Sequence, residues 1–249
     1  MTEDDARAWL DAQFDVSRET WARLESYIAF LTQEMVHQNL IAESTVPHIW
    51  ARHIVDSAQL IEFAAERGGD GQNIPGPRPV EGHWVDLGSG AGLPALVIAA
   101  LAPGMKVTMI ESRRKRVDFL NGAIAAMKLD NASVIGGRVE TAQVEPPADY
   151  ISARAYAPLD KLFASAIHLA RNSTIWVLPK GKNWQNELAL ARPSWQCVFH
   201  VEHSVTDPDS AIIIASDVTA KEKSGRGRTG QVKTGQAKAG RDKSGKRRK

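Results

Sequence analysis

Residues 86–94 read Asp-Leu-Gly-Ser-Gly-Ala-Gly-Leu-Pro and form the part of the chain best suited to hold a polar ligand. Gly88, Gly90 and Gly92 follow the acid at alternate positions, between a strand pattern and a helical one. Glycine permits positive φ and exposes bare backbone, and a helix start adds free N–H groups. A nicotinamide-binding turn would have a glycine in place of Leu93. The loop therefore predicts a ligand of another class, with a purely structural turn as the alternative.

A second acid, Glu111, is placed to meet the same ligand. It ends the next predicted strand, 23 positions after Gly88, so the two strand tips are expected to lie side by side. One carboxylate has acceptors for both hydroxyls of a ribose. The alternative is a charge at the start of the following helix, where Ser112 would be the N-cap. With the glycine loop beside it, we favour the ribose role.

Strands and helices alternate from residue 83 onward, which predicts a sheet covered on both faces. The expected fold is α/β and Rossmann-like, with a mostly parallel seven-stranded sheet. Strands are expected at 83–87, 106–111, 133–136, 149–153 and 174–178, with a closing antiparallel pair at 195–203 and 211–216. Helices are expected at 94–101, 113–127 and 159–170. Ligands in such sheets bind beyond the carboxyl ends of the strands.

Four zones divide the chain: an N-terminal helical region (1–67), a linker (68–82), the sheet domain (83–218) and a tail (219–249). The linker is rich in glycine and proline. In the first zone one amphipathic stripe recurs at helical spacing, and a second helix is expected from about Pro47 to Arg67. The stripe consists of Trp21, Leu24, Ile28, Leu31 and Met35.

Charge is distributed unevenly along the chain. The net charge is +2, but the last 29 residues hold 12 Lys or Arg against two acids, which leaves the rest at −8. Those 29 residues have no aromatic, Leu or Ile, so we expect a disordered tail. A nucleic-acid-binding arm and a solubilising tail remain equally open. A single cysteine and short apolar runs indicate a cytoplasmic protein that is not membrane-bound.

The acid-x-Gly-x-Gly-x-Gly order resembles the methionine-binding loop of class I methyltransferases. In that class, the segment after the third strand flanks the adenine, and here it reads Gly-Arg-Val-Glu and includes Val139 and Glu140. The tip of the fourth strand, with Arg154, would face the transferred methyl. The alternatives are a surface ion pair for Arg154 and a solvated helix start for Glu140.

Together these stretches resemble the small-subunit ribosomal RNA guanine-N7 methyltransferases, also called the glucose-inhibited division protein B family. The resemblance runs from about residue 39 to 214. Its motifs are Asn39-Leu40, Arg52-His53-Ile54-Val55-Asp56-Ser57, the glycine loop with Leu93-Pro94, Glu111-Ser112, Lys115-Arg116-Val117, Phe119-Leu120, Arg138-Val139-Glu140, Ser152-Ala153-Arg154-Ala155 and Leu178-Pro179-Lys180-Gly181. Ala95 and Glu111 depart from it, because glycine and aspartate are usual there.

The resemblance implies S-adenosylmethionine as cofactor, with contacts at Gly88, Leu93, Val139, Glu140 and Arg154. It also implies 16S ribosomal RNA or the small ribosomal subunit as partner. Since guanine N7 carries no proton, we expect no general base and assign no catalytic residue; we expect a monomer without a metal. A small-molecule methyltransferase and a non-catalytic nucleotide-binding module are the alternatives.

Exposed cations are the candidates for RNA contact, by neutralising phosphates. The alternative for each is a solvated helix face. The candidates are Arg113, Arg114, Lys115, Arg116, Lys180 and Lys182. His53, Asp56 and Ser57 lie at helical spacing, and we favour a structural role for them over contact with RNA. The tryptophans are expected in the core.

Overall fold

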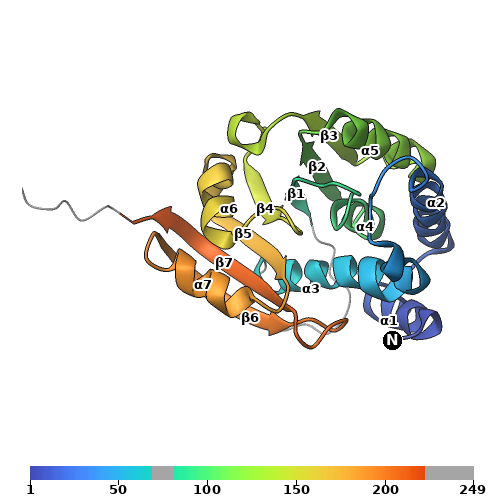
Figure 1. Ribbon diagram of the computed structural model, residues 1–249, viewed down its shortest axis with the longest axis horizontal. Coiled ribbons are helices and arrows are strands. Elements are labelled where there is room, and N and C mark those ends of the chain that lie inside the picture. Colours follow the sequence, from blue (N-terminus) through green and yellow to red (C-terminus); the bar gives the residue numbers. More distant parts are fainter. Residues whose placement is uncertain (69–80, 222–249) are drawn as a thin grey trace, which may run out of the picture.

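The computed structural model describes residues 1–68 and 81–221. Within them, seven strands form one sheet in the order β3-β2-β1-β4-β5-β7-β6 (Figure 1). They are β1 (Gly82–Leu87), β2 (Met105–Glu111), β3 (Ala132–Gly136), β4 (Ala148–Ser152), β5 (Ala170–Lys180), β6 (Trp195–His203) and β7 (Ala211–Ala220). The first five are parallel, and β7 runs antiparallel to both β5 and β6. The predicted fold class is confirmed.

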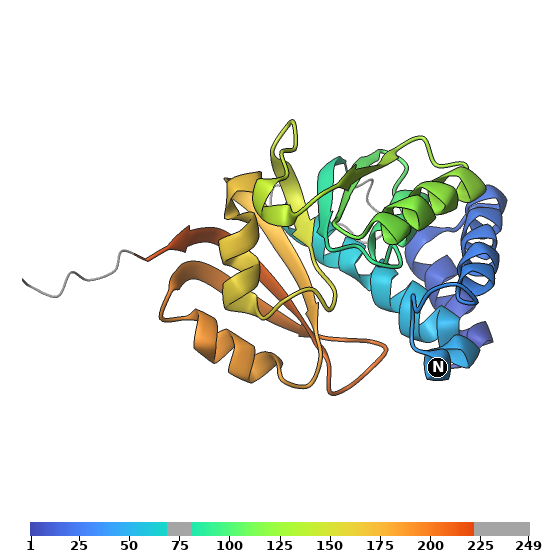
Figure 2. The same cartoon turned by 45° about the horizontal axis from the view of Figure 1, so that its top comes forward.

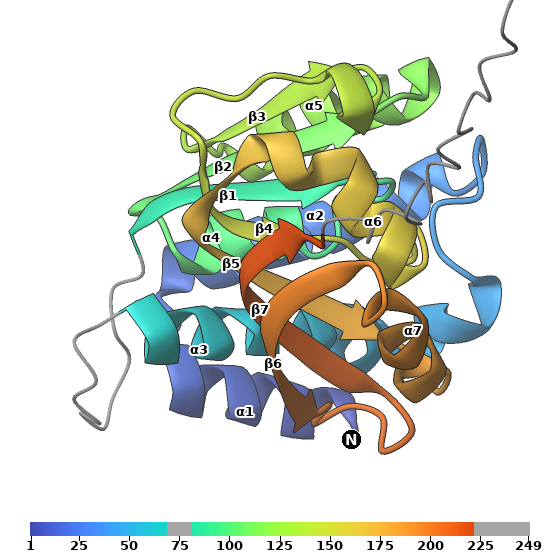
Figure 3. The same ribbon diagram turned by 90° about the vertical axis from the view of Figure 1, so that its left-hand side faces the viewer.

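Helices cover both faces of the sheet, as Figure 3 shows. Side chains along β1 alternate between two apolar clusters: Trp84 joins one, and Val85 and Leu87 join the other. On the first face lie α3 (Asp56–Gly68), α4 (Ala95–Leu101) and α5 (Arg114–Met127); on the second lie α6 (Leu159–Ala166) and α7 (Trp184–Ala191). The sequence did not predict α7.

The N-terminal helices belong to the same core as the sheet. α1 (Glu3–Phe14) and α2 (Arg18–Glu34) contribute buried side chains to the cluster that contains Trp84. The guanidinium of Arg7 lies 4.1 Å from the ring centroid of Trp50 and 5.1 Å from that of Trp21. The predicted boundary after residue 67 therefore separates no independent core.

The second predicted helix, from Pro47 to Arg67, is wrong as one regular element. The structure has a 3₁₀ turn at Glu43–His48, a π-helical segment at Trp50–Val55 and then α3. Pro47 lies within the 3₁₀ turn, where its missing N–H prevents a regular α-helical bond. Apolar spacing alone cannot distinguish these helix types.

Other boundaries move by a few residues. α4 begins at Ala95 with Pro94 at the N-cap, and the helix expected at 159–170 ends as a 3₁₀ turn at Ile167–Leu169. β7 continues to Ala220, beyond the predicted domain end at 218. Most of the linker (69–80) and nearly all of the tail (222–249) lie outside the described residues. No helix in the described ranges is both long and apolar enough to cross a bilayer.

α2 reaches the sheet domain through a close contact with α5. The rings of Phe30 and Phe119 stack with centroids 5.5 Å apart. Gly122 of α5 faces the ring of Phe30, and a Cβ built at Gly122 would be 2.6 Å from Phe30 Cζ. The missing side chain at this position therefore sets how closely the two helices approach.

We expect Gly122→Val to push α2 away from α5 and to lower the free energy of unfolding by about 1–3 kcal/mol. Gly137→Val is the control, because a Cβ there would have nothing within 4 Å. It should change stability by less than about 0.5 kcal/mol. Urea denaturation of both variants is the measurement, and equal effects would contradict the packing account.

Candidate functional site

The glycine loop follows β1 in a conformation that requires glycine. Gly88, Gly90 and Gly92 have φ of 63°, 57° and 81°. A Cβ at Gly88 would lie 2.5 Å from Tyr156 Cδ2, and one at Gly92 would lie 2.3 Å from Leu96 Cδ1. The backbone N–H groups of Gly88 and Ser89 donate to the carbonyl of Ile110, at 2.8 and 3.2 Å. The loop is thus pinned to the tip of β2, and only glycine fits at these positions.

Glu111 joins the loop to the start of α5. Its Oε2 accepts the N–H of Gly90 at 3.0 Å, and its Oε1 accepts the N–H of Arg113 at 2.8 Å. The carboxylate is buried, 6% exposed. The helix-start contact proposed as the alternative for Glu111 is present, but Ser112 is not the N-cap, because Arg113 occupies that position. Each carboxylate oxygen can accept a second hydrogen bond, so a ribose role stays a prediction.

Tyr27 of α2 also makes a hydrogen bond to the backbone of the loop. Its hydroxyl is fully buried and donates to the carbonyl of Ala91 at 2.8 Å. Sequence reasoning missed this residue, although it lies on the same helical stripe as Leu24 and Leu31. One hydroxyl in an otherwise apolar buried stripe was the available signal.

Asp86 lies at the end of β1, directly before the loop, and is buried. Its Oδ1 accepts the hydroxyl of Ser152 at 2.6 Å, and that hydroxyl oxygen accepts Trp84 Nε1–H at 2.8 Å. Its Oδ2 is buried and has no hydrogen-bond partner among the described residues. Burial raises the pKa of Asp86 to about 7, although the hydroxyls of Ser152 and Ser89 and the charge of Arg154 act to lower it.

A buried carboxyl group of this kind favours a ligand that carries a positive charge. Such a group would donate to the carboxyl oxygen that lacks a partner in the described residues and would favour the ionised form of Asp86. Asp86 is the first residue of the glycine motif, but the sequence alone did not predict a role for it. The signal for its role is burial, which the sequence does not state.

The other predicted site residues also lie at the carboxyl ends of the strands. Leu93 is buried in the loop, and Val139 is buried in a 3₁₀ turn that follows β3, with Glu140 exposed beside it. The N–H of Gly137 donates to the carbonyl of Glu111 at 3.0 Å, which links the end of β3 to the end of β2. These predicted residues therefore lie along one edge of the sheet.

Arg154 follows β4 and turns toward the N-terminal helices. Its Nη1 donates to Asp56 Oδ2 at 3.2 Å, and both Nη atoms lie 3.3 Å from His53 Nδ1. Its charge also acts on the ionisation of Asp86 and of Tyr27. The ion pair that was the alternative for Arg154 exists, but it is about four-fifths buried and not a surface pair.

The cationic side chains predicted to contact RNA differ in their exposure to solvent. Arg113, Arg114, Lys115 and Lys182 are exposed. Arg116 is partly covered, donates to the carbonyl of Asn39 at 2.6 Å and has Nη1 3.0 Å from where a Cβ of Gly90 would be.

Lys180 does not fit its predicted RNA contact. Its side chain is only 8% exposed, and its ammonium pairs with Glu187 at 2.8 Å and donates to the carbonyl of Ala157 at 2.9 Å. We therefore withdraw it from the RNA-binding candidates.

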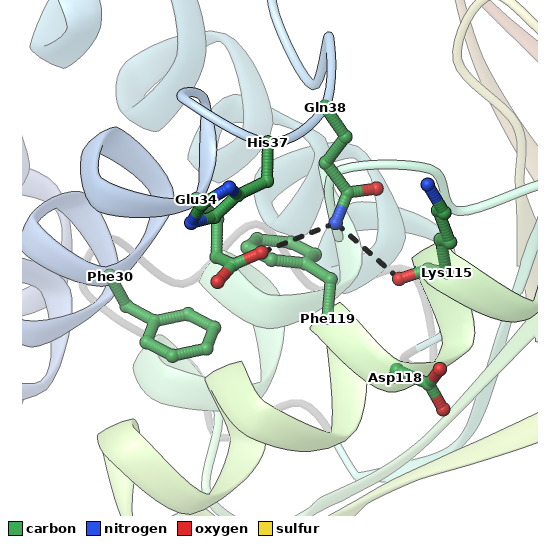
Figure 4. A pocket seen from close by; sticks show the side chains of 7 residues that line it. All are labelled: Phe30, Glu34, His37, Gln38, Lys115, Asp118 and Phe119. Atoms are coloured by element: carbon green, nitrogen blue, oxygen red, sulfur yellow. Dashed lines mark hydrogen bonds between the residues drawn. The ribbon is translucent and has the colours of Figure 1, made fainter.

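A surface pocket of about 310 Å³ lies between the end of α2 and the start of α5 (Figure 4). Gln38 crosses it, with its Nε2 3.4 Å from both Glu34 Oε2 and the carbonyl of Lys115. The pocket is lined by Phe30, Glu34, His37, Gln38, Lys115, Asp118 and Phe119. Its lining carries charges of both signs and includes none of the predicted cofactor residues. Among the described residues, no group of three or more His, Cys, Asp or Glu is arranged to hold a metal.

Comparison with known protein families gives a match over most of the chain. A family described as rRNA small subunit methyltransferase G matches residues 20–209. The chain is 46% identical over 227 residues to the ribosomal RNA small subunit methyltransferase G of Zymomonas mobilis, covering 90% of this chain and 99% of that protein. It is 45% identical over 224 residues to the protein of that name from Rhizorhabdus wittichii, covering 90% and 96%.

Solved structures resemble the fold at low sequence identity. A mutant of MtNAS in complex with S-adenosylmethionine aligns with a TM-score of 0.54 at 13% identity, over 87% of this chain and 84% of that chain. A SAM-dependent methyltransferase from Aquifex aeolicus aligns with a TM-score of 0.50 at 12% identity, over 68% and 92%. These similarities support the fold alone.

The contact between Tyr27 and the loop can be measured directly. We expect Tyr27→Phe to lower the free energy of unfolding by about 1–3 kcal/mol, because the buried carbonyl of Ala91 loses its donor. Tyr150→Phe is the control: Tyr150 is also buried, and its hydroxyl has no hydrogen bond among those found in the described residues. Chemical denaturation gives both values. A similar loss for the two variants would mean that the Tyr27 hydroxyl does not support the loop.

Proposed function

The chain belongs to the rRNA small subunit methyltransferase G family, and from this premise we propose that it transfers a methyl group from S-adenosylmethionine to N7 of a guanine in 16S ribosomal RNA. The observation in the structure that supports the proposal most strongly is the glycine loop after β1, with the buried Oδ2 of Asp86 before it, which has no hydrogen-bond partner in the described part of the chain. The family membership supplies the substrate class, and the loop supplies the place for the cofactor.

The residues of the loop fit this cofactor. The methionine part of the cofactor carries an ammonium group. This group can donate a hydrogen bond to Asp86 Oδ2, and its positive charge would stabilise the ionised carboxylate. The three glycines hold the positive φ values of the loop, and the space that a Cβ at Gly88 or Gly92 would need is filled by Tyr156 and Leu96. Leu93 gives the loop a buried apolar side chain.

The remaining cofactor contacts follow the order of the strands. We assign Glu111 to the ribose hydroxyls, using the free lone pairs of its two oxygens. We assign Val139 and Glu140 to the adenine, because they follow β3, the strand beyond Glu111. Arg154, at the end of β4, is assigned to the side where the methyl group is transferred.

The chemistry needs little from the protein beyond alignment. When bound, the sulfonium of the cofactor supplies an activated methyl group. Guanine N7 has a lone pair in the plane of the ring and no proton to lose, so the transfer requires no general base. His53 fits this scheme, because burial and the charges of Arg154 and Arg52 lower its pKa to about 4 and its ring is already hydrogen-bonded. The protein's contribution is orientation and exclusion of water.

The RNA is proposed to reach the site over the exposed cations at the start of α5. Arg113, Arg114 and Lys115 lie directly after Glu111, and Lys182 follows β5. In a body whose net charge is −8, such a cluster is where phosphates would be held. We further propose that the protein acts as a monomer in the cytoplasm.

The proposal is tested by labelled methyl transfer to small ribosomal subunits from cells that lack this activity. We expect one labelled methyl group, on a guanine N7, which is revealed by chemical cleavage of the RNA at 7-methylguanine. A methyl group on an amino group, a ribose or a C5 position would contradict it. So would cofactor binding without any transfer to RNA, as the small-molecule and non-catalytic alternatives require.

Asp86 makes cofactor affinity depend on pH. With its pKa raised to about 7 in the free protein, the carboxyl is protonated at lower pH and must lose that proton to accept a cation. The dissociation constant of S-adenosylhomocysteine should therefore be about tenfold higher at pH 6 than at pH 8. Calorimetry measures this, and Asp86→Asn should bind weakly at both pH values. Equal affinities of the native protein at pH 6 and pH 8 would exclude this role.

A further inference from the structure

Arg154 is held by two residues from a distant part of the chain. His53 lies within the π-helical segment Trp50–Val55, and Asp56 is the first residue of α3. Both side chains face the guanidinium of Arg154, at 3.3 Å from His53 Nδ1 and 3.2 Å from Asp56 Oδ2. The junction between the π-helical segment and α3 therefore presents two acceptors to one arginine.

The hydrogen bonds of His53 define its state. A guanidinium has only donors, so Nδ1 must be the acceptor and the ring proton lies on Nε2. That nitrogen lies 2.7 Å from Thr45 Oγ1, whose own hydroxyl donates to the carbonyl of Ala42 at 2.7 Å. The ring N–H of His53 and the hydroxyl of Thr45 thus each have an acceptor. The lowered pKa of His53, about 4, keeps the ring neutral at neutral pH, as this arrangement requires.

Asp56 is fixed by the far end of the sheet. Its Oδ1 accepts the hydroxyl of Thr206 at 2.8 Å and the amide of Gln59 at 3.1 Å, which leaves Oδ2 to Arg154. Thr206 lies in the loop between β6 and β7, which reaches toward the N-terminal helices in Figure 2. A neighbouring ion pair, Arg52 with Asp207 at 3.1 Å, joins the same two segments.

The backbone after Arg154 is strained. Ala155 has a φ of 53°, in the left-handed region that residues with a Cβ rarely occupy. Such a conformation persists only where its surroundings hold it, and it recurs at functional sites. Here the residue directly before Ala155 is Arg154, whose side chain is bonded to His53 and Asp56.

We propose that His53 and Asp56 are positioning residues for methyl transfer, which hold the guanidinium of Arg154 in place at the carboxyl end of β4. The inference rests on the proposed function, in which Arg154 belongs to the site. An arginine fixed in advance at two points loses less conformational freedom when cofactor and RNA bind. The motif around residues 52–57, for which we favoured a structural role, thus acts on the site through Arg154.

Two substitutions of His53 separate positioning from simple structural support. In His53→Asn, the amide oxygen takes the place of Nδ1 and can still accept from Arg154. In His53→Gln, the longer amide takes the place of Nε2, so it keeps the contact to Thr45 but loses the acceptor for Arg154. Asp207→Asn is the matched control, since it breaks the neighbouring ion pair and leaves Arg154 untouched.

The first readout is single-turnover methyl transfer at saturating cofactor and RNA, with thermal unfolding as the check on folding. We expect His53→Gln to slow transfer about tenfold or more, His53→Asn to recover most of the rate, and Asp207→Asn to stay within about twofold of the native rate. In an Arg154→Lys background, His53→Gln should have little further effect. Equal rates for the two His53 variants, fast or slow, would overturn the proposal.

A second readout uses the native protein without cofactor, and so does not depend on the reaction. Nitrogen NMR of the imidazole should show His53 neutral, with its proton on Nε2, from pH 5.5 to 8. A proton on Nδ1, or a titration near pH 6.5, would overturn the proposal. If the NMR result holds but the native protein transfers no methyl group to small-subunit RNA, the proposed function fails and the hydrogen-bond network stands.

Discussion

The shape of one glycine loop, in which three residues hold positive φ, is what the other groups of the site depend on. One hydrogen bond closes the loop from within, from the N–H of Gly92 to the carbonyl of Ser89. The carbonyl of Ile110, the carboxylate of Glu111 and the hydroxyl of Tyr27 also bond to its backbone. These three groups come from β2 and α2, so tertiary contacts fix the loop together with its own glycines.

Because Tyr27 reaches the loop from α2, the N-terminal helices belong to the site. The same holds for His53 and Asp56, whose bonds to Arg154 join the π-helical segment and the start of α3 to the segment after β4. Asp86 lies between these supports, with a buried oxygen that has no partner in the described residues. An α/β sheet of this kind offers a crevice at its strand tips; here the added helices supply the groups that fix the residues around it.

Strand and helix order, the parallel sheet and the glycine loop could be predicted, since each rests on local periodicity or on residues adjacent in sequence. The position of Glu111 beside Gly90 followed from sheet geometry. What could not be predicted depends on burial and on contacts between distant residues. The charge of Lys180 indicated a surface contact, but Glu187 of α7, a helix that the sequence did not reveal, pairs with it. The π-helical turn and the state of Asp86 likewise have no local signature.

A crystal structure of the protein with S-adenosylhomocysteine would show whether the glycine loop and Asp86 hold the cofactor. We expect the amino group within hydrogen-bonding distance of Asp86 Oδ2, the ribose hydroxyls on Glu111 and the methionine part against Gly88 and Gly90. A ligand bound in the pocket between α2 and α5, or one in the loop that leaves Asp86 without a partner, would contradict it.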